Sequence, residues 1–90
     1  MGVLEMITNE MLSKYTMKTL DEYKNDFGDS VETEIGFYQT FLFQTDHISK
    51  KIDEEYILGA SKAELKAKYG DILNARQYCR EQINRLESEL

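Results

Sequence analysis

The chain has 90 residues and a formal net charge of −6 at pH 7, with 41% hydrophobic and 31% charged residues. An acidic chain repels nucleic-acid phosphates, so we expect no direct nucleic-acid binding. Six Tyr and four Phe residues argue against intrinsic disorder, and the length suits one domain over residues 1–90.

The sequence contains no proline. This favours long helices joined by few, short connections. We therefore expect an all-α fold of three helices, with four as the alternative. The helical stretches cover about residues 3–27, 31–58 and 62–89, and the last of them is a long helix with a heptad pattern.

Features of targeting and membrane insertion are missing from the sequence. The longest apolar run, from Phe41 to Phe43, is far shorter than the roughly 20 residues that a membrane-spanning helix needs. The first residues lack the basic, apolar and small-residue layout of a signal peptide. The single Cys79 cannot form an internal disulfide. We expect a cytoplasmic protein without membrane contact.

The first stretch, 3–27, has an interrupted pattern. Apolar residues at helical spacing run from Leu4 to Met11, stop around Thr16 and resume at Leu20. Thr16 is a candidate cap for a second helix. The pattern leaves open whether this stretch is one helix or two.

The loop at 28–30 is the clearest one in the chain. Gly28 suits the left-handed conformation just past a helix end. Ser30 or Asp29 is expected to cap the next helix, and Asp29 and Glu32 have the spacing of a capping box.

The segment from Asp21 to Glu34 contains six acids and one lysine. The simpler interpretation is a solvated face with acids that favour helix starts. The alternative is an acidic inhibitor of a host nucleic-acid-handling enzyme, because spaced carboxylates can mimic a phosphate backbone, as in small acidic phage inhibitors of host nucleases. The carboxylates that would act in this way are Asp21, Glu22, Asp26, Asp29, Glu32 and Glu34.

The second stretch, 31–58, is apolar on two sides, so we expect it to be the most deeply buried helix. Its aromatic segment covers more than one helix face, and at least one ring should therefore face solvent. Phe37 and Phe43 are the candidate anchors for a partner. The polar triplet 45–47 is a candidate kink or break.

The last stretch begins with a capping box formed by Ser61 and Glu64. We expect the helix to continue through Gly70 at a cost of about 1 kcal/mol, and to protrude, because about 40 Å exceeds what a small globule needs. Apolar residues then recur at alternating steps of four and three, which is the spacing of a helix-pairing stripe. The stripe consists of Leu65, Tyr69, Ile72, Arg76, Cys79, Ile83, Leu86 and Leu90.

This stripe is the predicted interaction surface. We expect its first part, up to about Ile72, to pack inside the domain, and Ile83 and Leu86 to contact another chain. Arg76 marks the change: it either lies along the stripe with its charge in water or fixes the register of the pairing. The residues of the predicted surface are Leu65, Tyr69, Ile72, Arg76, Ile83 and Leu86.

No group of residues completes an active site. The single His47 and Cys79 lack the further ligands of a zinc site. A ferritin-like Glu-x-x-His pair is absent, because position 44 is Gln44. Cys79 is better explained as a small, buried hydrophobic side chain than as a catalytic residue. We expect no enzyme activity, no catalytic or metal-binding residues and no cofactor.

Residues 33–42 and 44–46, with 69–77 and 80–87, resemble small, mostly uncharacterised proteins encoded in phages and prophages of Gram-positive bacteria, often near tail or lysis genes. The resemblance covers about residues 31–89. It implies a non-catalytic accessory protein in the host cytoplasm, with a structural or assembly role through contact with a protein partner. The partner is either a second copy of the chain, giving a homo-oligomer, or another protein.

Overall fold

The computed structural model describes the backbone of residues 3–90 and the side chains from residue 10 onward. Leu4, at the start of the first predicted stripe, lies outside the described side chains. The described chain forms four helices and no strand, which confirms the all-α fold with a long C-terminal helix. The helices are α1 (Val3–Thr16), α2 (Leu20–Phe27), α3 (Val31–Ile57) and α4 (Lys62–Glu87).

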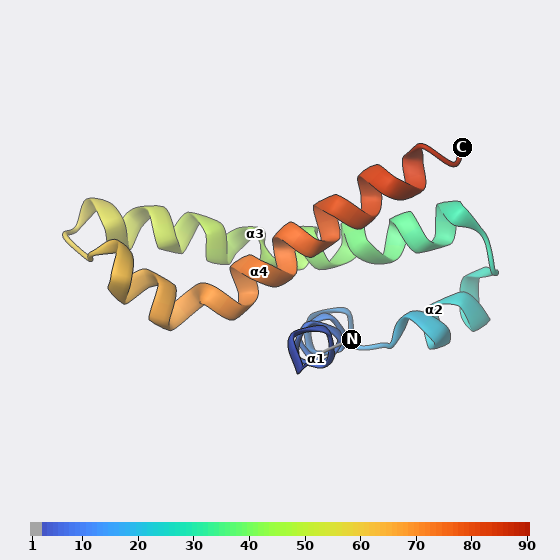
Figure 1. The fold of residues 1–90 in the computed structure, drawn as a ribbon, viewed down its shortest axis with the longest axis horizontal. Coiled ribbons are helices and arrows are strands. Elements are labelled where there is room, and N and C mark those ends of the chain that lie inside the picture. Colours follow the sequence, from blue (N-terminus) through green and yellow to red (C-terminus); the bar gives the residue numbers. More distant parts are fainter. Residues whose placement is uncertain (1–2) are drawn as a thin grey trace.

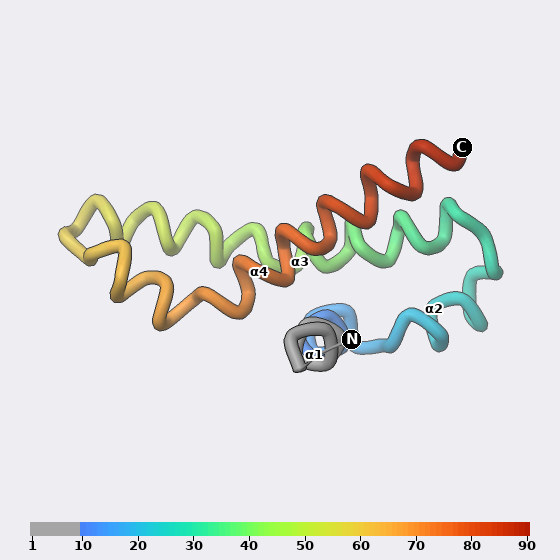
Figure 2. The backbone as a smooth tube through the Cα atoms, in the orientation of Figure 1, coloured from blue at the N-terminus to red at the C-terminus, as the bar shows by residue number. Residues whose placement is uncertain are grey.

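Helices α3 and α4 form a long antiparallel hairpin, and α4 crosses α3 near the middle (Figure 1). Helix α1 packs against both helices and is seen nearly end-on in this view, while α2 packs against α3. The α2–α3 and α3–α4 turns lie at opposite ends of α3 (Figure 2). The result is an elongated molecule of 45 × 24 × 24 Å.

The first stretch is two helices. The Thr16 hydroxyl donates to the Leu12 carbonyl at 2.7 Å, and Thr16 is the last residue of α1. The prediction that Thr16 caps the second helix is therefore wrong. Met17 then adopts a left-handed conformation with φ 64°. Thr19 caps α2 by accepting from the Glu22 amide at 3.2 Å, and its own amide donates back to the Glu22 carboxylate at 3.1 Å.

Helix α3 starts at a serine cap and runs without a break. Ser30 accepts from the Thr33 amide at 3.2 Å, so the predicted Asp29–Glu32 capping box is wrong. The predicted break at 45–47 is wrong, because one helix runs through these residues. The Thr45 hydroxyl donates to the Phe41 carbonyl at 2.8 Å and so stays on the helix's own backbone.

The turn between α3 and α4 follows the local signals. Gly59 has φ 111°, which other residues rarely adopt. Ser61 caps α4 by accepting from the Glu64 amide at 3.2 Å. Helix α4 then continues through Gly70, as predicted.

The core lies where α1 crosses the hairpin. Helix α3 supplies its largest side chains, which agrees with the prediction that this stretch is the central one. Phe41 is fully buried, and its ring meets the edge of Tyr15 from α1 at a centroid distance of 5.8 Å. The buried cluster consists of Leu12, Ile35, Phe37, Tyr38, Phe41, Ile72, Ala75, Cys79 and Leu86.

Candidate functional site

Most of the heptad stripe is covered by the chain's own helices. Leu90, its last member, lies beyond α4 and is 70% exposed. Leu86 is 1% exposed and belongs to the core, so the prediction that it contacts another chain is wrong. Tyr69 and Ile83 are half-buried and pack against the same core. The stripe is therefore not a free docking surface. Its buried members are Leu65, Ile72, Arg76, Cys79 and Leu86.

Arg76 is buried as well, and the interpretation that its charge lies in water is wrong. Its Nη1 donates to the Leu42 carbonyl at 2.9 Å and to the Thr45 hydroxyl at 2.6 Å. Its Nη2 meets the Asp46 carboxylate at 3.1 Å. These bonds tie α4 to one position along α3, so Arg76 sets the pairing within the chain.

The Asp21–Glu34 acids are partly neutralised by neighbouring lysines. Lys24 lies 2.6 Å from Glu34 and 3.6 Å from Asp29, and the hydrogen bond to Glu34 raises the pKa of Lys24. Lys18 pairs with Asp26. Glu22 is engaged in the cap of α2. These contacts weaken the negative field that a nucleic-acid mimic needs.

The two predicted aromatic anchors differ in exposure. Phe37 is 2% exposed and faces the core, so the prediction that it anchors a partner is wrong. Phe43, on the other side of α3, is 75% exposed and stays available for contact.

A further apolar surface was missed by the sequence interpretation. Tyr56, Ile57 and Leu58 are consecutive and are 54%, 81% and 86% exposed. They form the hairpin tip, at the end of α3 farthest from α2 (Figure 1). Three adjacent residues cannot all face one side of a helix, and this could have indicated the exposure.

An ion pair joins α3 to α4 next to the hairpin tip. Glu55 on α3 accepts from Lys68 on α4 at 2.7 Å, and this hydrogen bond lowers the pKa of Glu55. The two side chains therefore link the helices just behind the tip. The tip residues are held on a helical hairpin rather than on a long loop.

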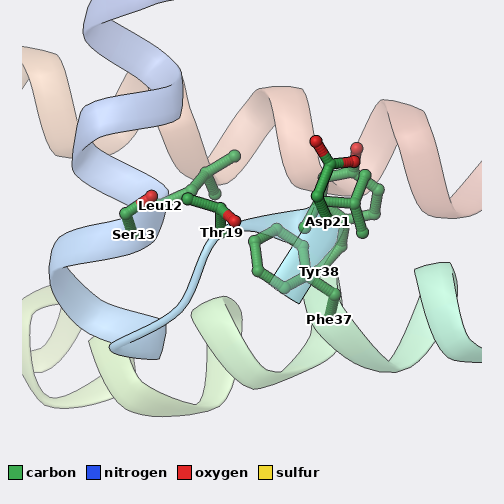
Figure 3. A pocket seen from close by; sticks show the side chains of 7 residues that line it. Leu12, Ser13, Thr19, Asp21, Phe37 and Tyr38 are labelled. Atoms are coloured by element: carbon green, nitrogen blue, oxygen red, sulfur yellow. The ribbon is translucent and has the colours of Figure 1, made fainter. Parts of the chain in front are cut away.

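A concave feature lies where α1 and α2 meet α3 (Figure 3). We call it the α1–α2 cleft, and its volume is about 300 Å³. Buried Phe37 and Tyr38 contribute ring atoms, and exposed Thr19 and Asp21 form a polar edge. The lining residues are Leu12, Ser13, Thr19, Leu20, Asp21, Phe37 and Tyr38.

The groups that carry chemistry are dispersed. Burial raises the pKa of the Cys79 thiol to about 12, so the thiol is protonated and enclosed at neutral pH. His47 is exposed on α3. Among the residues described, no three His, Cys, Asp or Glu side chains are grouped to hold a metal ion.

In the part of the chain that the structure describes, no helix has the length and apolar character needed to cross a membrane. No protein family, curated protein or solved structure matches this chain. The interpretation of its function therefore depends on the surfaces described above.

Proposed function

We propose that this chain is a non-catalytic, phage-type accessory protein that acts by protein–protein interaction in a structural or assembly role. The resemblance of residues 31–89 to small phage and prophage proteins supports the phage context. The exposed hairpin tip is the observation that carries the interaction. The heptad stripe, by contrast, holds the chain itself together.

The physical argument for the tip is the cost of leaving it in water. Fully burying one large aliphatic side chain is worth about 1.5–3 kcal/mol, and both Ile57 and Leu58 are more than four-fifths exposed. Adjacent exposed apolar residues on a supported hairpin are typical of a contact surface. A partner that covers them gains this free energy without reorganising the core.

The acidic-inhibitor alternative has less support. Lys18 and Lys24 pair with three of its six carboxylates, and a fourth is engaged in a helix cap. Of the predicted set, Asp21 and Glu32 are exposed and have no ion pair within the described residues. We therefore favour contact through the tip.

Site-specific photo-crosslinking in the cell that carries the gene tests this proposal. A photoreactive residue replaces Leu58, and in a control chain it replaces Gln77, which is an exposed polar position on α4. We expect a discrete cross-linked species from position 58 and a much lower yield from position 77. Adding Ile57→Glu to the first chain should reduce the yield. Equal yields at both positions would contradict the proposal.

A further inference from the structure

We propose that the hairpin tip docks into the α1–α2 cleft of a second copy of this chain, which makes the protein self-assembling in a head-to-tail manner. This inference rests on the proposed function, because it names the partner of the tip. Three properties of the two surfaces support it: their shape, their separation and their charge.

The two surfaces are complementary in shape and polarity. The tip is a convex turn that presents Ile57 and Leu58 to solvent. The cleft is a hollow of about 300 Å³ with apolar walls from Leu20 and Phe37 and a polar edge at Asp21. An apolar projection with a polar surround fits such a cleft.

The tip cannot enter the cleft of its own molecule. Phe37 in the cleft and Ile57 at the tip are twenty positions apart on one continuous helix, which is about 30 Å at a rise of 1.5 Å per residue. The rigid α3 therefore holds the two surfaces apart. Any tip that enters a cleft comes from another molecule.

The charge near the two surfaces differs in sign. The region around the cleft, residues 10–34, has seven acids and three lysines. The region around the tip, residues 50–68, has five lysines and four acids. Beside the tip, Lys62 and Lys66 are exposed at the start of α4, and Asp53 and Glu54 are exposed near the end of α3, so the positive balance there is small. Asp21 is exposed at the cleft edge. Opposite charges favour the contact between tip and cleft over contact between two tips.

The geometry of the contact determines the type of assembly. Tip and cleft are different surfaces, so the contact is heterologous: every open assembly keeps one free tip at one end and one free cleft at the other until a ring closes. The contact area is small, and this predicts weak, concentration-dependent association. Pairs of opposite charge near the surface also predict that salt weakens it.

Two blocking variants separate the two halves of the contact. The tip variant carries Ile57→Glu and Leu58→Glu, at exposed positions. Its control is Phe43→Glu, which changes another exposed apolar residue of α3. The cleft variant is Asp21→Lys, and its control is Glu32→Lys, because both acids are exposed in the first turn of a helix. Thermal melting checks that all four chains fold.

Sedimentation velocity and light scattering measure the mass across a concentration series. We expect the wild type and both controls to exceed 10.5 kDa as concentration rises, while the tip variant and the cleft variant each stay at 10.5 kDa. An equimolar mixture of the two variants should form a dimer that grows no further, because one chain supplies an intact tip and the other an intact cleft.

The remaining outcomes overturn the head-to-tail contact. A strictly monomeric wild type excludes self-assembly. Association that is lost in the tip variant but kept in the cleft variant indicates symmetric pairing of two tips. Two monomeric variants whose mixture stays monomeric exclude docking of tip into cleft. In each case the cross-linking yield at position 58 decides separately whether the tip contacts another protein.

Discussion

The Arg76 guanidinium and the Thr45 hydroxyl lie 2.6 Å apart, although 31 positions separate the two residues along the chain. Thr45 is fully buried; its oxygen accepts from Arg76 and its proton goes to the Phe41 carbonyl. Arg76 also reaches the Leu42 carbonyl. A buried charge with these partners holds α4 at one register on α3.

Replacing Thr45 by Val should destabilise the chain by about 1–3 kcal/mol, because the similar shape is kept while a buried partner of Arg76 is lost. Asp46→Asn is the control: that carboxylate also contacts Arg76, but its side chain is 58% exposed, and we expect a loss below about 1 kcal/mol. Urea denaturation gives both values. Similar losses for the two variants would show that the buried hydroxyl has no special role.

Two leucines, one in the core and one at the hairpin tip, differ in burial and should respond differently to truncation. Leu86 is 1% exposed and Leu58 is 86% exposed. We expect Leu86→Ala to lower the free energy of unfolding by about 2–5 kcal/mol, through lost burial and a cavity. Leu58→Ala should change it by less than about 0.5 kcal/mol. If Leu86→Ala leaves the urea midpoint unchanged, the heptad stripe is not part of the core.

Two glycines should respond to alanine in opposite directions. A Cβ atom at Gly70, inside α4, meets no atom within 4 Å, so Gly70→Ala should stabilise the chain by about 0.5–1 kcal/mol. Gly28 has φ 104°, which strains an L residue, so Gly28→Ala should destabilise it. Thermal melting measures both. A lower melting temperature for Gly70→Ala would mean that α4 is not regular at this position.

Burial of the Cys79 thiol predicts alkaline destabilisation. Its pKa rises from an ordinary 9.0 to about 12 in the folded chain. Between these pH values the unfolded thiol loses its proton while the folded thiol keeps it, so the free energy of unfolding falls as the pH rises. Burial also raises the pKa of Tyr38 above its ordinary 10.0, which adds to the fall at higher pH.

The Cys79→Ala variant serves as the control, since it should show a shallower fall in unfolding free energy just above pH 9.0. Urea unfolding at a series of pH values measures the slopes. A thiol reagent at neutral pH should react with the wild type only on unfolding, because the side chain is fully buried. Rapid labelling of the native chain would contradict this burial.

Local features of the sequence were enough to predict much of the helical architecture. Gly28 and Ser61 mark helix ends through backbone freedom and capping, and these depend only on near neighbours. The apolar content of residues 31–58 predicted the central helix correctly. The cap at Thr19 was missed because two nearby threonines offer the same chemistry, and only the structure shows which amide each one meets.

The sequence by itself determined that α4 has an apolar stripe in need of a cover, through the period of Leu65, Ile72 and Leu86. Only the tertiary structure decided that α1 and α3 of the same chain provide that cover. The physical reason is that burial of apolar surface is non-directional, so a stripe does not specify its partner. The place where α1 crosses the hairpin likewise decides which side chains the core buries. Ile57 and Leu58 lie outside this core and remain in solvent.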